Sequence, residues 1–317
     1  MQFQHVDVFA DDPFTGNSVT VFLADGTAAT GQMLSITREF RHFESIFLWP
    51  TAAGSRWRAR VFDLEGELDF AGHPVLGAAA VLHDRAGGDA TQQWTIELSA
   101  KTVTVQTARD RTARDRTARD GTPRDGTPRD GTARDGTGFR ATLDQGRPGY
   151  GPTVSGAAAA PILHGIGLCA ADLTPGLEPA VVSTGLRYLV IPVSAAALAR
   201  AAITAADFAS RLAAVGAQFA YLLDPDALEG RHWTNDGRTE DIATGSAAGT
   251  VGAYLARAGR IALNRPFTLH QGRFTGRPSQ IQVEPRGSAG DITRILVGGQ
   301  VTLVATGTLR NLPRVIP

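Results

Sequence analysis

Two segments far apart in the sequence share a pattern that could bind an anion. They read FAGHP at residues 70–74 and ATGSA at residues 243–247. Each places a glycine and one polar residue before a run of small residues typical of a helix. Glycine permits close backbone approach, and the first helical turn presents unpaired N–H groups at the positive end of the dipole. Two such starts related by a pseudo-twofold axis could hold one carboxylate across a cleft, although each could be only a capped turn.

The elements that must position these segments are strands and helices in mixed order. Period-two alternation predicts strands over residues 2–9, 18–23, 56–62, 94–98, 102–106, 139–143, 180–193 and 219–224, with later strands near Phe267, Ile281, Ile295 and Val301. Helices are predicted over residues 31–40, 74–83, 195–201, 205–215 and 246–257. The mixture indicates an α+β fold in which the second half repeats the logic of the first.

Length and charge narrow the function classes. The chain has 317 residues, 43% of them hydrophobic, which is enough for two domains with their own cores. We expect an N-terminal domain of residues 1–146 and a C-terminal domain of residues 147–317, with the last strand packing back on the first domain. The 31 basic and 31 acidic residues cancel, so no global field would attract nucleic acid or a membrane. The expected partner is therefore a small molecule.

Cysteine and histidine usage argues against disulfide, thiol and metal chemistry. Cys169 is the only cysteine, which excludes an intramolecular disulfide, a cysteine-based zinc site and a two-thiol mechanism. The histidines show no ligand spacing, so no metal is expected. The first ten residues do not resemble a signal peptide, and no apolar run approaches the roughly 20 residues of a membrane helix. These features predict a cytoplasmic protein.

Residues 107–136 form six tandem pentapeptides of the form Thr-Ala/Pro-Arg-Asp-Arg/Gly. A segment without large apolar side chains cannot offset its conformational entropy by burial, so we predict a disordered loop that lengthens a hairpin tip. A charged docking arm is the alternative. The alternating arginine and aspartate residues argue against it, because they cancel each other's field.

Five ordered blocks of the sequence resemble the PhzF-like proteins of phenazine biosynthesis. The blocks are DVF at 7–9, PFTGNS at 13–18, FAGHP at 70–74, EDIATGSAAG at 240–249 and QGRFTGRPS at 271–279. Their order and spacing span almost the whole chain, with the pentapeptides as an insertion. The resemblance is therefore carried by the complete set of blocks rather than by any single motif.

This resemblance implies a diaminopimelate-epimerase-like fold, with two similar domains that each curl a mostly antiparallel sheet around a central helix. It also implies a homodimer, a site between the domains, and an isomerase that needs neither metal nor organic cofactor. The best-known activity of the family is isomerisation of trans-2,3-dihydro-3-hydroxyanthranilate. The family's site positions fall on the catalytic residues Glu44, His73, Asp241 and Ser246 and on the substrate-binding residues Gly72, Gly245, Thr244 and Asn17.

By this resemblance Glu44 is the proton carrier. A carboxyl group in a dry cleft has a raised pKa, and it can take a proton from one carbon and return it on the same face. His73 and Asp241 would orient the substrate, while Ser246 and the helix-start N–H groups would hold its carboxylate. Each side chain also has a plainer interpretation: Glu44 as a solvated strand-edge charge, and the others as cap or turn residues.

Three functions fit these residues. The first is an isomerase that moves a proton on a small anionic substrate, either dihydroaromatic or amino-acid-like. The others are a single-base epimerase or lyase of the same fold, and a noncatalytic protein that binds small anions. Related epimerases place a cysteine at each helix start, where this chain has His73 and Ser246, so two-thiol racemisation is excluded. Phe43 and Ile242 depart from the family pattern beside the glutamate and the aspartate, which affects the substrate more than the proton chemistry.

Overall fold

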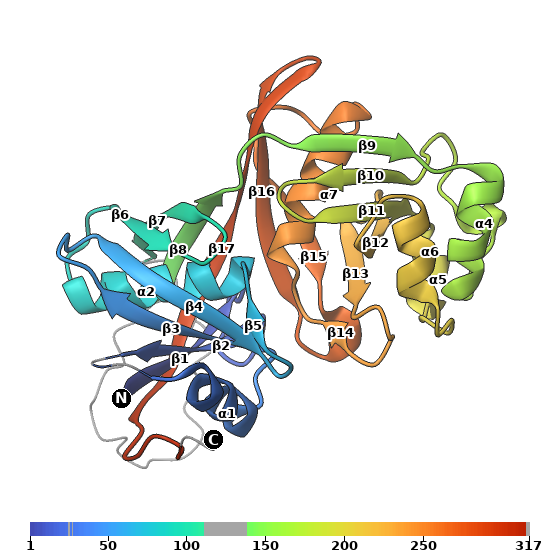
Figure 1. The fold of residues 1–317 in the computed structure, drawn as a ribbon. Coiled ribbons are helices and arrows are strands. Elements are labelled where there is room, and N and C mark those ends of the chain that lie inside the picture. The colour runs from blue at the N-terminus through green and yellow to red at the C-terminus, as the bar shows by residue number, and fades with distance from the viewer. Residues whose placement is uncertain (25, 27, 111–137, 315–317) are drawn as a thin grey trace, which may run out of the picture.

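The computed structural model describes residues 1–24, 26, 28–110 and 138–314. It confirms the α+β class and shows two lobes side by side (Figure 1). The N-terminal lobe contains β1 (Gln2–Val8), β2 (Asn17–Leu23), α1 (Thr30–Phe40), β3 (Glu44–Pro50), β4 (Arg56–Asp63), β5 (Glu67–Leu68), α2 (Gly72–Ala86), β6 (Gln92–Glu97), β7 (Thr102–Asp110) and β8 (Gly138–Asp144).

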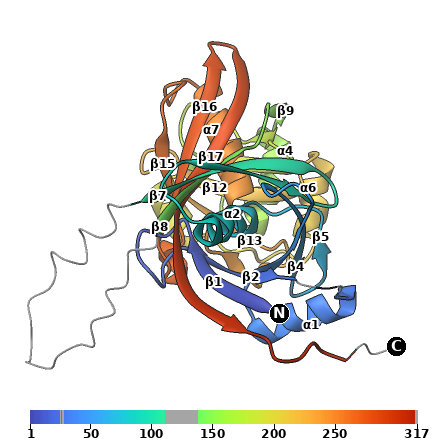
Figure 2. The same ribbon diagram turned by 90° about the vertical axis from the view of Figure 1, so that its left-hand side faces the viewer.

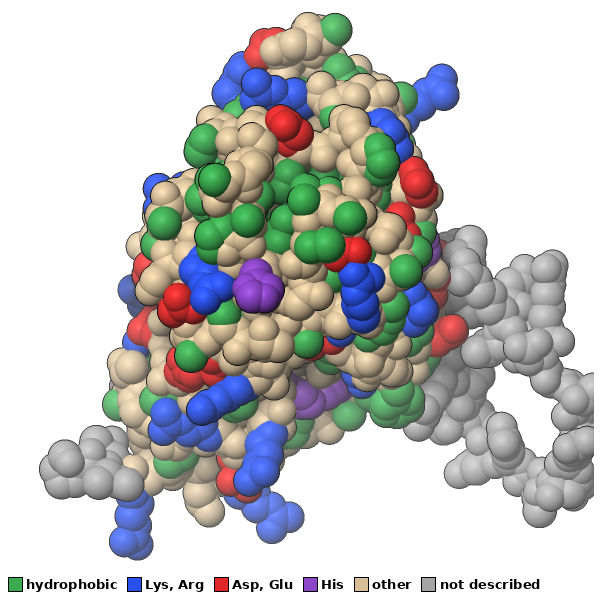
Figure 3. All heavy atoms as spheres, turned by 90° about the vertical axis from the view of Figure 1, so that its right-hand side faces the viewer, with side chains coloured by type: hydrophobic (Ala, Val, Ile, Leu, Met, Phe, Trp, Pro, Cys, Tyr) green, Lys and Arg blue, Asp and Glu red, His purple; other side chains and the backbone are tan. Residues whose placement is uncertain are grey.

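The C-terminal lobe follows the same plan with extra helices on its outer side. It contains β9 (Gly149–Thr153), α4 (Gly156–Gly165), β10 (Ala180–Ser183), β11 (Arg187–Pro192), α5 (Ala195–Arg200), α6 (Phe208–Ala214), β12 (Phe219–Asp224), β13 (Glu229–Trp233), β14 (Glu240–Asp241), α7 (Gly245–Arg257), β15 (Phe267–Gln271), β16 (Ser279–Ser288) and β17 (Asp291–Thr308), with short 3₁₀ turns at Ala170–Asp172 and Arg273–Thr275. On the face of this lobe that points away from the other, basic and acidic side chains are interspersed (Figure 3).

Each lobe wraps its strands around one buried helix. Figure 2 shows α2 inside a ring of strands, and every residue of this helix from Gly72 to His83 is buried. Small residues make this placement possible. A Cβ atom at Gly77 would lie only 2.8 Å from the Val19 side chain, and one at Gly252 in α7 would lie 2.5 Å from Val283. Larger residues at these glycines would force the helices away from their sheets.

The long strand β17 joins the two lobes. It pairs antiparallel with β16 in the C-terminal lobe, with β8, and then with β1 in the N-terminal lobe. One continuous element therefore fixes how the lobes meet. The domain boundary after residue 146 stays a prediction.

The structure corrects several sequence predictions. Residues 180–193 form two strands, β10 and β11, because the chain turns at Gly185 with φ of +139°. Residues 149–165, where no strand or helix was predicted, contain β9 and α4. The first repeat residues, 107–110, extend β7, where the buried Thr107 side chain bonds His83 and Trp94. The rest of the predicted loop, residues 111–136, lies outside the described residues.

None of the helices in the described ranges is long and apolar enough to cross a membrane.

Candidate active site

The starts of α2 and α7 meet at the seam between the lobes. A Cβ atom added at Gly72 would lie 3.6 Å from the backbone nitrogen of Ser246 and 3.8 Å from the Cα of Gly245. Within the described chain, neither the Ala71 nor the Thr244 N-cap forms a side-chain capping hydrogen bond. Two uncapped positive helix ends that face each other so closely repel each other, and an anion between them would relieve that repulsion.

Glu44 lies beside this junction at the first residue of β3. It is paired between Val19 of β2 and Asp63 of β4, and it is only 8% exposed. The chain leaves β2, passes through α1 and returns as β3, which pairs parallel to β2. This path places the Glu44 carboxyl on the inner face of the sheet, which α2 covers. The Glu44 Oε2 atom lies 3.3 Å from His73 Nδ1, but it has no hydrogen-bond partner among the described residues.

Burial sets the protonation of both partners in this contact. Burial raises the pKa of Glu44 well above its ordinary value, and the negative charges of Asp241 and Asp63 raise it further. Burial lowers the pKa of His73 to about 4, so the ring is neutral at pH 7. The His73 Nε2 atom is also buried, and no partner for it occurs in the part of the chain described here. The pair therefore offers a weakly acidic carboxyl and a neutral imidazole, both with hydrogen-bonding capacity to spare.

Asp241 is held quite differently, because hydrogen bonds occupy both of its carboxylate oxygens. Asn17 Nδ2 of the N-terminal lobe donates to Oδ1 at 2.9 Å, and Thr244 Oγ1 donates to Oδ2 at 2.6 Å. Gln271 Nε2 donates to the Asp241 carbonyl at 2.8 Å and to Thr244 Oγ1 at 3.0 Å. This network fixes the carboxylate across the seam. It leaves Asn17 Oδ1 as a buried acceptor without a partner among the described residues.

Ser246 completes the group in the first turn of α7. Its Oγ lies 2.8 Å from the Tyr188 hydroxyl, and its carbonyl accepts a 3.3 Å hydrogen bond from Thr184 Oγ1. All eight residues predicted from the sequence thus lie at one junction, with Asn17 and Thr244 bonded to Asp241 and Gly72 against Gly245.

The side chains that contact this group and that sequence reasoning missed include Tyr188, Gln271, Thr184 and Gln145, whose Nε2 atom donates to the Gly245 carbonyl at 2.9 Å. Gln271 opens one of the blocks that carry the family resemblance, and this position could have drawn attention to it. Tyr188 sits in an apolar strand, where a tyrosine has the pattern of a core residue.

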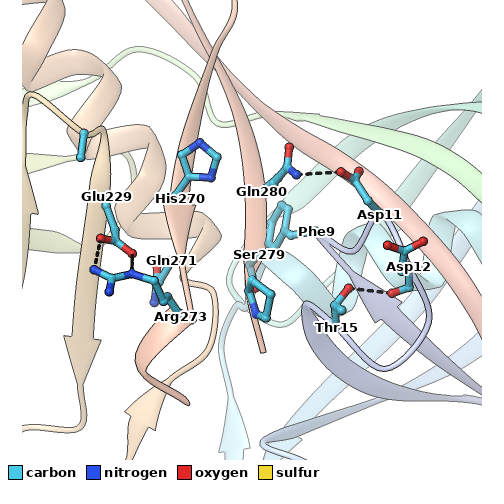
Figure 4. A pocket seen from close by; sticks show the side chains of 12 residues that line it. Phe9, Asp11, Asp12, Thr15, Glu229, His270, Gln271, Arg273, Ser279 and Gln280 are labelled. Atoms are coloured by element: carbon cyan, nitrogen blue, oxygen red, sulfur yellow. Dashed lines mark hydrogen bonds and ion pairs between the residues drawn. The ribbon is translucent and has the colours of Figure 1, made fainter. Parts of the chain in front are cut away.

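A cavity of about 440 Å³ lies on the far side of Phe9 and Gln271 from this junction. Phe9 lines this cavity, and a Cβ atom at Gly245 would lie 3.1 Å from the Phe9 ring. Figure 4 shows Glu229 with its partner Arg273 on one side and Asp11 and Asp12 on the other. Three carboxylates line this space, so it suits an anion less well than the helix junction does.

The chain matches known proteins along almost all of its length. Residues 6–307 match the family model described as phenazine biosynthesis-like protein. The chain is similar to trans-2,3-dihydro-3-hydroxyanthranilate isomerase of Pseudomonas fluorescens, with 30% identity over 314 residues, which cover 96% of this chain and 97% of the relative. It is 28% identical over 316 residues to an uncharacterized isomerase, YddE, of Salmonella typhimurium, covering 96% of each chain.

The fold also matches a solved structure of a predicted epimerase from Pseudomonas aeruginosa. The TM-score is 0.83 and the sequence identity 43%, over 98% of this chain and 99% of the other. Sequence and fold thus agree on a relationship that includes both lobes and the seam between them.

Proposed function

The chain belongs to the phenazine biosynthesis-like protein family and is an isomerase, and from this premise we propose that Glu44 moves a proton between carbons of a small carboxylate substrate. One observation carries the proposal. Two uncapped helix starts meet beside a buried carboxyl whose Oε2 atom has no hydrogen-bond partner among the described residues. The first feature binds an anion, and the second leaves a proton-transfer group free to act on it.

The substrate's carboxylate would lie against the amides at Gly72, Gly245 and Ser246. The neighbouring side chains supply no positive charge, because His73 is neutral at pH 7 and Glu44 and Asp241 are acids. The attraction for an anion therefore comes from the two helix ends.

The proton step needs only Glu44 and a conjugated acid. The ionised carboxylate takes a proton from a carbon, and the electron pair of that C–H bond spreads through the conjugated system. Glu44 then returns the proton to a different carbon of that system, so atoms and electrons balance without a redox partner. A buried carboxyl with a raised pKa is a stronger base once ionised and also a competent acid in the second half of the reaction.

One base on one face favours proton relocation over inversion. Asp241, the other acid at the junction, already accepts hydrogen bonds at both oxygens. Phe219 opens β12 in the C-terminal lobe as Glu44 opens β3 in the other, so the matched position carries no base. A racemase needs a second proton donor on the opposite face of its substrate.

The name of the Pseudomonas fluorescens relative supports a dihydroaromatic amino acid as the substrate class. His73 Nε2 and Asn17 Oδ1, both buried without partners in the described ranges, would hydrogen-bond its amino or hydroxyl groups. A single-base epimerase is the second candidate, supported by the solved relative described as a predicted epimerase.

Deuterium labelling tests the proposal and separates the two candidates. The chain and its Glu44→Gln variant would be incubated with cyclic and acyclic unsaturated acids in deuterated water, and NMR would locate the label. An isomerase places deuterium on a new carbon with a shifted double bond, whereas an epimerase places it on the original carbon with inverted configuration. Glu44→Gln should lower the rate by about 10²- to 10⁴-fold. A folded Glu44→Gln variant with wild-type turnover would refute the role of Glu44.

A further inference from the structure

Tyr188 is a buried side chain whose hydroxyl reaches the start of α7. It lies in β11 and is 2% exposed, and its hydroxyl is 2.8 Å from Ser246 Oγ. Its ring packs on Phe219 and His232, with centroid distances of 5.4 and 5.6 Å. These ring contacts would hold a phenylalanine equally well, so packing alone does not account for the hydroxyl.

The two hydroxyls of this pair carry two protons but share only one hydrogen bond. Burial keeps the Tyr188 phenol protonated, because it raises the pKa of the group further above its ordinary value. A phenol is a better donor than an alcohol, so the favoured arrangement has Tyr188 donating to Ser246 Oγ. The Ser246 proton is then free to donate to a ligand.

The free proton belongs to a residue at the contact of the two helix starts. The backbone nitrogen of Ser246 is 3.6 Å from the position of a Cβ atom at Gly72, at the contact of the two helix starts. Thr184 Oγ1, beside the same hairpin, also lies 3.3 Å from the Ser246 carbonyl, but its single proton has a closer acceptor in Gln145 Oε1 at 2.8 Å. The Tyr188 hydroxyl is therefore the contact that holds the Ser246 side chain.

We propose that Tyr188 is a positioning residue that orients the Ser246 hydroxyl toward the substrate's carboxylate. The inference rests on the proposed function, since it concerns how the same site recognises its anion. Tyr188 acts through Ser246 and contributes to binding rather than to proton transfer. Its loss should therefore raise KM and leave kcat unchanged, because the carboxylate interaction is the same in the ground state and the transition state.

The test is a double-mutant cycle of Tyr188→Phe and Ser246→Ala. Each variant would be titrated by calorimetry with 3-hydroxyanthranilate and with its uncharged methyl ester, and KM and kcat would be measured for any substrate found by labelling. Tyr188→Phe should weaken binding of the acid by about 3- to 10-fold, the usual value of one hydrogen bond, and should leave ester binding unchanged. When Ser246 is already replaced by alanine, adding Tyr188→Phe should cause no further loss of binding affinity for the acid.

Tyr254→Phe is the matched control, because Tyr254 lies near the other end of α7 and its hydroxyl donates to the Glu178 carbonyl rather than to a residue of the site. Three results would each overturn the inference. They are additive losses of binding affinity in the double mutant, equal losses for the acid and the ester, and an unchanged affinity in Tyr188→Phe. Failure of the wild type to bind the acid would overturn it together with the anion site. If the wild type binds the acid but shows no Glu44-dependent deuterium exchange, the proposed function is refuted. The double-mutant cycle would then still test the role of Tyr188 in binding.

Discussion

The two lobes present matching backbones to the site but different side chains. Each has a parallel strand pair, β2–β3 and β11–β12, and each ends its run of strands in a glycine-led buried helix. Where the N-terminal lobe begins its second strand with Glu44, the C-terminal lobe begins it with Phe219. The repeated feature is the uncapped helix start, and the unrepeated feature is the buried glutamate.

The acids on the two sides of the seam have also diverged in their surroundings. Asp241 comes from β14, directly before α7, and hydrogen bonds from Asn17 and Thr244 fix it. Glu44 comes from β3 and keeps an unpaired buried oxygen in the described structure, with a raised pKa. A fixed, fully bonded carboxylate orients a ligand well, and a loosely partnered one exchanges protons. This difference is what the proposed function uses when it gives substrate orientation to the C-terminal lobe and proton transfer to the N-terminal lobe.

The largest effect should come from shortening the proton carrier. Glu44→Asp keeps the acid but withdraws its carboxyl by one methylene, roughly 1.5 Å. A displacement of this size should lower kcat by about 100-fold, because proton transfer needs close approach to the carbon. Steady-state rates on the substrate found by labelling would measure the loss, with Glu39→Asp on the exposed side of α1 as the control. A wild-type rate in Glu44→Asp would mean that the chemistry is not confined to the N-terminal lobe.

A smaller effect should appear in the pH dependence. If ionised Glu44 is the base, kcat/KM rises with pH through its raised pKa. Asp241→Asn removes one of the negative charges that raise this pKa, so the rising limb should move to lower pH. His73 is already neutral above about pH 4, so its titration should cause no change in kcat/KM near pH 6.5. If the rising part of the kcat/KM pH profile stays at the same pH in Asp241→Asn, then Glu44 and Asp241 are not electrostatically coupled.

The sequence predicted the helices of the site better than its strands. Gly72 and Gly245 each open a run of small residues, and both helices were found within three residues of their predicted bounds. In contrast, β3 was missed because its residues, ESIFLWP, form a nearly continuous apolar run without alternation. The β10–β11 turn was merged into one strand, since apolar residues resume directly after Gly185.

The site residues also differ in whether the local sequence was enough to predict them. The paired helix starts were visible as a local repeat in the sequence. Glu44 was recognised only through resemblance to a family, because nothing local distinguishes it from a surface charge. Tyr188 was missed because its contact with Ser246 joins residues 58 positions apart, and only the folded chain brings them together.

The smallest effect concerns stability. It tests whether the ionised Glu44 carboxylate lowers the stability of the folded chain. The folded chain binds the Glu44 proton more tightly than the unfolded chain, whose carboxyl has the ordinary pKa of 4.5. This linkage stabilises the fold fully below pH 4.5, and the contribution is lost as pH rises through the raised folded-state pKa. Glutamine does not titrate, so Glu44→Gln should gain in Tm over the wild type as pH rises toward 8, by on the order of 2 °C. Calorimetry across this range, with exposed Glu39→Gln as the control, would measure the trend. A Tm advantage that shrinks with rising pH would show that the fold stabilises the Glu44 anion, contrary to its assignment as the high-pKa member of the pair.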